Sequence, residues 1–398
     1  MIKTALITML MLYAPKLLVL STTNNVTCID TETGTVTPDV VTPGQWPNDI
    51  LWFQEHFYVV NSGSDDCTLQ KIDPETWQVE ILGIGSGYNC WAVEHVKGDT
   101  LAVSSAVNNS IILVNASTMT IIGEITGVGP NPEWFAVVGD SIYAACGGWM
   151  SSDKVVVADL NTMLPVDTIT TFTNTQGCTW DGVDQVYAIC TGSYTANDGE
   201  IHVIETATGT VSNVIQTGFA PAFGVMRGDL LYVGDVYGQG VISINTVTAT
   251  LEEASQYPGG SGLSVDENNI LWVANYHDGT VKGYDENHAE VAGYSGISSC
   301  MALEASRSAG SSVEGDCFIP VNPHAGISAF PSPASSVVQV ALPPANSSTP
   351  ALYSLSGRRI CAAAGSSGDL WTFDVSTIPQ GIYLIRAGKA SCRISVVR

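Results

Sequence analysis

Basic residues are scarce in this chain. Only 14 of its 398 residues are lysine or arginine, against 38 aspartates and glutamates, which gives a formal net charge of −24. Nucleic-acid binding depends on lysine and arginine that neutralise phosphates, and an anionic membrane surface repels a chain of this charge. The composition therefore argues against both as partners.

A hydrophobic run long enough to cross a bilayer is also missing. Lys3 is followed by an apolar stretch over residues 4–14, well short of the roughly 20 residues that a transmembrane helix needs. An early positive charge followed by a short apolar stretch is typical of a secretory signal. We therefore predict a signal peptide at residues 1–14 and no transmembrane segment.

The ten cysteines include no Cys-x-x-Cys pair, which argues against a zinc or haem site. Their number fits an exported protein that forms disulfides. The best candidate pairs are Cys361 with Cys392 and Cys300 with Cys317. Connectivity does not follow from the sequence alone.

Motifs of several enzyme classes are lacking too. There is no Gly-rich phosphate loop, and no Ser-His-Asp arrangement can be placed by spacing. Acidic loops at 64–66, 197–200 and 285–287 offer oxygen ligands for Ca²⁺, but none has the spacing of an EF-hand. Solvated turn residues explain them better, so no cofactor is expected, with calcium as the open alternative.

What the chain does contain is a repeat of about forty residues, the length of a β-propeller blade. Its middle strand recurs, for example, at 99–104, 140–145 and 269–274. A complete unit holds four strands, as at 90–94, 101–104, 110–115 and 120–125. The turns between the third and fourth strands carry Asn115 or Asp159, whose short side chains bond their own backbone, so we give them a structural role.

The two ends of the array are incomplete in complementary ways. Residues 17–40 supply three strands without a first one, and residues 299–304 supply a first strand alone. Together they make one blade, and such a closure removes free sheet edges. We predict an all-β, seven-bladed β-propeller over residues 15–305, with one blade shared between the two ends of the array. Cys90, Cys178 and Cys300 occupy equivalent first-strand positions and are expected to fill the axial channel as small apolar side chains.

The units resemble the YVTN and NHL-like propeller repeats of bacterial exported proteins. The likeness rests on residues 269–281 and 154–162 and extends over the whole ring. It implies the fold only, because this architecture hosts binding proteins, lyases, lactonases and oxidoreductases.

Beyond a Ser-, Gly- and Pro-rich linker at 306–328, a new pattern of short strands begins. Phe330–Ser335, Leu352–Ile360, Phe373–Arg386 and Cys392–Arg398 resemble, in order, the C-terminal sorting domain of type IX secretion cargo, a small β-sandwich. The resemblance implies that residues 329–398 engage the type IX secretion machinery. It places the protein outside the cell or on the outer-membrane surface. A terminal adhesion module of similar shape is the alternative.

Alternate loops of every blade emerge on the same face of a propeller, and here those loops are long, aromatic and acidic. Aromatic rings beside carboxylates stack on sugars or hold peptides. We therefore expect a monomeric, non-catalytic protein that binds a glycan, a peptide or a partner protein on this face. The candidate ligand-binding residues are Trp46, Trp134, Trp149, Tyr194, Asp235, Tyr237, Tyr276, His277 and Asp278.

The alternative is a metal-dependent lyase or lactonase with its site at the axial channel. Such chemistry needs histidines and carboxylates that converge on one point. Of the six histidines, only His277 falls on the long-loop face, near Asp235 and Asp278 in the predicted layout. A solvated loop histidine explains it better, and no catalytic residue is assigned.

Overall fold

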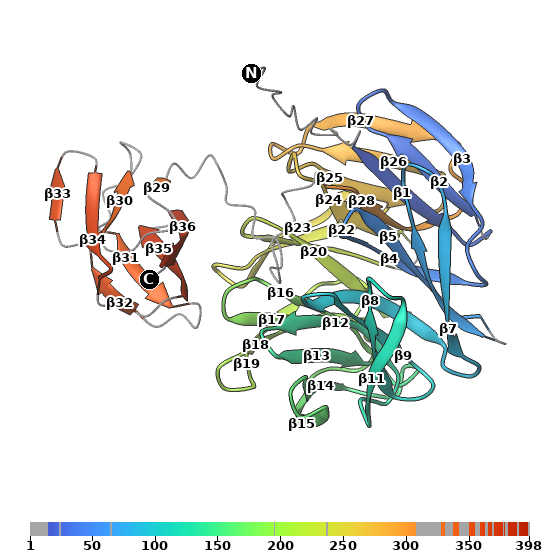
Figure 1. Ribbon diagram of the computed structural model, residues 1–398, viewed down its shortest axis with the longest axis horizontal. Helices are drawn as coiled ribbons and strands as arrows, with labels where there is room; N and C mark the ends of the chain where they lie inside the picture. Colours follow the sequence, from blue (N-terminus) through green and yellow to red (C-terminus); the bar gives the residue numbers. More distant parts are fainter. Residues whose placement is uncertain are drawn as a thin grey trace, which may run out of the picture.

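In the computed structural model the described chain folds into β-strands (Figure 1). The structure describes residues 15–307, except 24, 64–65, 195 and 236–237. It also describes 328–396, except 331–336, 342–349, 355–358, 363–364, 368–369, 377, 379–380 and 388–389. The predicted signal peptide and nearly all of the predicted linker lie outside these residues. Within them, no helix is long and apolar enough to cross a membrane.

Strands β1 to β28 form seven four-stranded antiparallel sheets, which confirms the predicted seven-bladed propeller. Blade 1 contains β28 (Cys300–Ala305), β1 (Lys16–Ser21), β2 (Asn25–Asp30) and β3 (Thr35–Val41). Blade 2 contains β4 (Pro47–Phe53), β5 (His56–Asn61), β6 (Cys67–Ile72) and β7 (Val79–Gly85). Blade 3 contains β8 (Cys90–Lys97), β9 (Thr100–Ser105), β10 (Ser110–Asn115) and β11 (Thr120–Thr126). Blade 4 contains β12 (Pro132–Val138), β13 (Ser141–Cys146), β14 (Lys154–Asp159) and β15 (Leu164–Thr170).

The remaining blades repeat this order. Blade 5 contains β16 (Thr175–Trp180), β17 (Gln185–Cys190), β18 (Glu200–Glu205) and β19 (Thr210–Gln216). Blade 6 contains β20 (Phe223–Arg227), β21 (Leu230–Gly234), β22 (Val241–Asn245) and β23 (Thr250–Tyr257). Blade 7 contains β24 (Gly262–Val265), β25 (Leu271–Asn275), β26 (Thr280–Tyr284) and β27 (Glu290–Ser295).

The ring closes where β1 pairs with β28, as the incomplete repeats predicted. The two strands run antiparallel, with Val19 opposite Leu303 and Leu17 opposite Ala305. Past the end of β28, the Ser306 hydroxyl accepts the backbone N–H of Lys16 at 2.7 Å. Blade 1 is therefore built from strands that lie nearly three hundred residues apart in the sequence.

Apolar contacts between neighbouring blades hold the ring together. Tyr58 of blade 2 packs with Leu101 of blade 3, and Tyr187 of blade 5 packs with Leu231 of blade 6. The outermost strands face water instead: Ile122 of β11 is 54% exposed. Inner strands buried on both sides explain why their sequences are apolar without alternation.

The predicted turns and cysteine positions had different outcomes. Asn115 Oδ1 accepts the N–H of Thr118 at 2.8 Å, and Asp159 Oδ1 accepts that of Thr162 at 2.7 Å, which confirms their structural role.

Cys90, Cys178 and Cys300 pack in the apolar clusters between blades. The prediction that they fill the channel was wrong, because each packs with apolar side chains of the adjacent blade. The three positions are not equivalent either: Cys90 and Cys300 open β8 and β28, whereas Cys178 is the fourth residue of β16.

The innermost strands, first in each blade, meet their neighbours around the central axis. The loop that precedes each innermost strand lies at the same end of the blade as the loop that joins its second and third strands, because consecutive strands are antiparallel. We call this end of the ring the loop face.

Residues 328–396 form two further four-stranded sheets. One has the order β29 (Ser328–Phe330), β30 (Val337–Ala341), β34 (Leu370–Asp374) and β33 (Gly365–Ser367). The other has the order β32 (Arg359–Ala362), β31 (Ala351–Ser354), β35 (Gly381–Ala387) and β36 (Ala390–Val396). Phe373 of the first sheet and Leu352 of the second are both fully buried, as in the small β-sandwich that the sequence predicts.

The backbone of the second sheet does not favour the predicted Cys361–Cys392 disulfide. Cys361 lies opposite Leu352, Leu352 opposite Ile385, and Ile385 opposite Cys392. The two cysteines are thus three strand spacings apart, about 14 Å, whereas a disulfide joins Cα atoms less than about 7 Å apart. Cys317, of the predicted Cys300–Cys317 pair, lies outside the described residues.

The closure of the ring predicts a stability effect at Leu18, a fully buried residue of β1. Leu18→Ala leaves a cavity beside β28 and is expected to lower the free energy of unfolding by about 2–5 kcal/mol. Urea denaturation of the purified protein measures the change. Ile122→Ala on exposed β11 is the control, with an expected change below about 0.5 kcal/mol. Equal stability of the two variants would contradict a ring closed by β1.

Candidate functional site

Three carboxylates lie on the innermost strands of neighbouring blades. Asp49 belongs to β4, Glu94 to β8 and Glu304 to β28. β4 contacts both β28 and β8, and the negative charges of Asp49 and Glu304 both act on Glu94. We call these three residues the axial carboxylates.

Asp49 is held by groups of two other blades. Its Oδ2 accepts the backbone N–H of Val93 at 3.0 Å. Burial raises the pKa of Asp49 to about 7, although hydrogen bonds from Val93, Ile50 and the Trp134 side chain act in the opposite direction. Asp49 therefore titrates near neutral pH.

Glu94 lies deeper, four residues into its strand and about 13 Å from the strand start. Its side chain is exposed, so water reaches this level of the axis. Desolvation by the surrounding strands, with repulsion from Asp49 and Glu304, raises the pKa of Glu94 to about 8, against the attraction of Arg307.

Glu304 has the positive partner that the other two lack. The Arg307 guanidinium lies 3.2 Å from its Oε1, and the Ser264 hydroxyl donates to its Oε2 at 2.7 Å. Burial nevertheless outweighs both contacts and raises the pKa of Glu304. Among the residues that the structure describes, Asp49 and Glu94 form no comparable ion pair.

Aromatic rings gather at the start of the innermost strands. Trp91 of β8 meets Trp134 of β12 edge to face at 5.6 Å, and Trp134 meets Phe223 of β20 at 5.3 Å. Trp149, in the loop between β13 and β14, lies with its ring 6.5 Å from that of Trp91. We call these four residues the aromatic cluster.

Trp134 connects the aromatic cluster to the axial carboxylates. It belongs to blade 4, yet it contacts Phe223 of blade 6 and bonds Asp49 of blade 2. Contacts to non-adjacent blades on two sides place its indole across the axis. Trp149, which is 57% exposed, extends the cluster to the surface of the loop face.

The other aromatic candidates have separate positions. Trp46 precedes β4 with a positive φ of 54° and is 63% exposed. Tyr194 is half-buried, and its hydroxyl accepts a hydrogen bond from the Gln176 side chain at 2.7 Å. Tyr237 lies outside the described residues.

The polar candidates take part in turns. Asp235 is 1% exposed and accepts the backbone N–H of Gln239 at 3.2 Å. Tyr276, His277 and Asp278 share one turn, in which Asn275 Oδ1 accepts the N–H groups of His277 and Asp278 at 3.1 Å. Of the candidates, therefore, the structure joins Trp134 and Trp149 through Trp91, and it gives Asp235 a structural contact.

A second polar group lies between blades 4 and 5. Glu133 is 3% exposed, and burial raises its pKa to about 8 although Asn131 donates a hydrogen bond to it. Polar atoms of Glu133, Asn131, Ser152 and Asn174 are buried with no partner among the described residues. Such groups usually bind ordered water.

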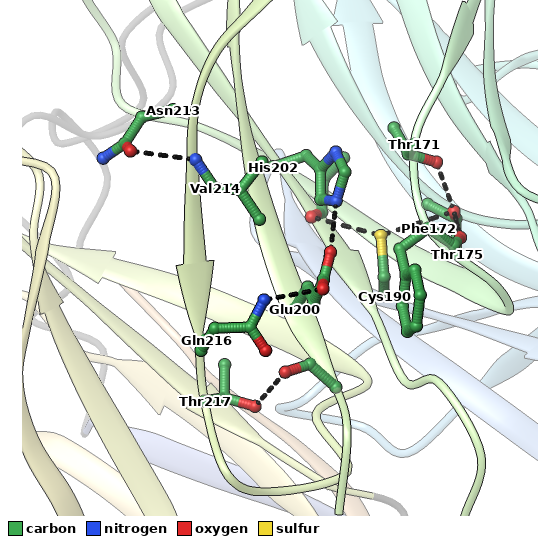
Figure 2. Close-up of polar contacts among 12 residues, drawn as sticks. Thr171, Phe172, Thr175, Cys190, Glu200, His202, Asn213, Val214, Gln216 and Thr217 are labelled. Carbon is green, nitrogen blue, oxygen red and sulfur yellow. Dashed lines mark hydrogen bonds and ion pairs between the residues drawn. The ribbon is translucent and has the colours of Figure 1, made fainter.

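Farther from the axis, blade 5 carries a histidine–glutamate pair (Figure 2). His202 Nε2 lies 2.8 Å from Glu200 Oε2, and the Gln216 side chain donates to Glu200 Oε1 at 2.6 Å. Both residues belong to β18, the third strand of the blade, so they lie away from the axis. In the described part of the chain, no three His, Cys, Asp or Glu residues are grouped so as to hold a metal ion.

The axial carboxylates and Trp91 were not among the sequence candidates. A signal was present: Glu94 and Glu304 each stand four residues after a cysteine, Cys90 or Cys300, that opens an innermost strand. A carboxylate at the same offset in two first strands indicates a pair near the axis.

Comparison with known proteins identifies the C-terminal part. Residues 328–395 match the family of secretion system C-terminal sorting domains. This domain directs the protein through the type IX secretion system to the cell surface or the extracellular space. No curated protein matches the chain.

Solved structures resemble the propeller in fold. A functionally unknown protein from Desulfotomaculum acetoxidans has a TM-score of 0.57 and 13% identity, over 74% of this chain and 99% of that one. A putative 6-phosphogluconolactonase from Bacteroides uniformis has a TM-score of 0.55 and 14% identity, over 74% of this chain and 100% of that one. Apo AztD from Citrobacter koseri has a TM-score of 0.51 and 11% identity, over 73% and 97%. At these identities the likeness concerns the fold alone.

The raised pKa of Glu94 predicts a pH-dependent effect of Glu94→Gln. Between its unfolded pKa near 4.5 and its folded pKa of about 8, the native state binds a proton that the unfolded state lacks. Stability from this group is therefore present at pH 4 and lost as the pH rises to 8. The variant should gain stability relative to the native protein between pH 5 and pH 9, as measured by urea denaturation. Glu124→Gln on exposed β11 is the control and should show no such trend. If the change in stability depends on pH in the same way for both variants, the raised pKa of Glu94 is contradicted.

Proposed function

We propose that the propeller is an exported, non-catalytic binding protein that accepts a basic side chain of a peptide or partner protein at the axial mouth of its loop face. The observation that carries the proposal is the contact between the aromatic cluster and an axial carboxylate. Aromatic faces attract cations, and carboxylates neutralise them.

The charge of the site favours a basic ligand. Asp49 and Glu94 have raised pKa values because desolvation and repulsion from Glu304 disfavour their ionised forms. A nearby guanidinium would oppose this effect, as an opposite charge stabilises a carboxylate. Arg307 supplies an internal example of a guanidinium beside an axial carboxylate, since it lies 3.2 Å from Glu304. The net charge of −24 would further attract a basic partner from a distance.

The surface of the site favours binding as well. Trp149 and Trp46 are large apolar side chains that remain 57% and 63% exposed on the loop face. Trp149 contacts Trp91 edge to face at 6.5 Å, so its ring has support from the aromatic cluster. An ordered, exposed tryptophan is a common anchor for a ligand.

An enzyme of the lyase or lactonase kind is the second candidate. Carboxyl groups that titrate at about pH 7 and pH 8, as Asp49 and Glu94 do, are suited to acid–base chemistry near neutral pH. His277 does not support a metal-dependent enzyme, because it lies in a turn whose backbone N–H groups are bonded by Asn275. Turnover of lactone or polyuronide substrates by the purified propeller would favour this candidate over binding.

The binding proposal predicts a preference for arginine or lysine over matched neutral residues. Peptide arrays, followed by calorimetry on paired peptides that carry arginine or citrulline, measure this preference. Affinity for the basic peptide should fall as salt is raised. An array that gives only glycan ligands, or equal affinity for arginine and citrulline peptides, would refute it.

Variants connect that binding to the site. Trp149→Ala should lower the affinity for the basic peptide by about tenfold or more, as expected for an anchor tryptophan. Asp49→Asn combined with Glu94→Gln should remove the preference for arginine over citrulline. Ile122→Ala, on the outer strand β11, is the control and should leave the affinity within about twofold. Unchanged binding in the Trp149 variant would place the ligand elsewhere.

A further inference from the structure

Two buried cysteines meet at the junction of blades 2 and 3. Cys67 opens β6, the third strand of blade 2, and Cys90 opens β8, the innermost strand of blade 3. Both side chains are fully buried, and both belong to the apolar cluster that Tyr58 and Leu101 form between these blades.

The two thiols are in direct contact. The backbone N–H of Cys90 lies 3.3 Å from the Cys67 sulfur, and the two side chains hydrogen-bond to each other. The other described cysteines differ. Cys300 donates to the carbonyl oxygen of Asn275 at 3.1 Å, and Cys190 lies 3.5 Å from the Thr175 hydroxyl.

The surroundings of Cys67 favour its thiolate. The Cys90 side chain and the backbone N–H groups of Cys90, Asn89 and Tyr88 lower the pKa of Cys67 to about 6, against the opposing effect of burial. Asn89 has a positive φ of 52°, which lets consecutive N–H groups turn toward one acceptor. A thiolate is the form that attacks disulfides.

We propose that Cys67 and Cys90 form a disulfide that links blades 2 and 3 when the protein is exported. The oxidant is a disulfide donor of the cell envelope, such as a thiol–disulfide oxidoreductase. Cys67 thiolate attacks the donor's disulfide and releases one donor thiol. Cys90 loses its proton, attacks the mixed disulfide and releases the second donor thiol, so the donor gains the two electrons that the protein loses.

The location of the protein supports this step. The sorting domain directs it to the cell surface or the extracellular space, where disulfides persist. The bond forms while the blades assemble, because both sulfurs are buried in the finished ring. It closes the segment 67–90, which includes β7 and the loop that leads to β8.

Peptide mapping of the exported full-length chain tests the proposal. The protein is denatured without reductant in the presence of an alkylating agent, digested and examined by mass spectrometry. The expected product is one species in which the Cys67 and Cys90 peptides are joined, and it separates on reduction. Alkylation of both residues, or a bond from Cys67 to a different cysteine, would overturn the proposal.

Stability gives a second measurement. Reductant should lower the melting temperature of the native chain by several degrees, since a cross-link of this loop length constrains the unfolded state. In the Cys67→Ser, Cys90→Ser double variant, reductant should no longer lower the melting temperature in this way. In Cys28→Ser, the decrease should be the same as in the native chain. If the double variant does not fold, the peptide map of the native chain still decides the matter. If reductant leaves the melting temperature of the native chain unchanged, the proposed disulfide is contradicted.

Discussion

The pairing of β1 with β28 is the contact on which the rest of this structure depends. It joins the two ends of the repeat array into one blade, so that every innermost strand has a neighbour on both sides. A sheet closed in this way exposes no inner edge for pairing with other chains. Without it, blade 1 would lose its innermost strand, and Glu304 would no longer lie beside Asp49 and Glu94.

Closure also produces the chemistry of the axis. The innermost strands bring carboxyl groups from three blades together around the axis. Desolvation raises the pKa values of all three, and repulsion adds to it at Asp49 and Glu94. The same convergence lets Trp134 reach Asp49 on one side and Phe223 on the other. The site is therefore formed by the ring as a whole and not by any single blade. Within the described chain, Arg307 is the basic residue that forms an ion pair with an axial carboxylate.

The sequence predicted the ring and its composite blade because local signals repeat. Turn residues such as Asn115 and Asp159 recur at fixed positions, and the missing strand at one end of the array matches the extra strand at the other. The sorting domain was recognised because its strand motifs keep their order. Side-chain direction was harder to predict. Cys90, Cys178 and Cys300 were expected in the channel but pack between blades. The axial carboxylates and the Cys67–Cys90 contact join residues of different blades, and no local pattern shows which of them meet.

The most direct test of this account is a density map of the propeller bound to an arginine-containing peptide. We expect the guanidinium to lie at the axial mouth, within hydrogen-bonding distance of Asp49 or Glu94 and beside Trp134 or Trp149. A peptide bound on the outer strands, or on the face opposite the loop face with the axial carboxylates unoccupied, would contradict it.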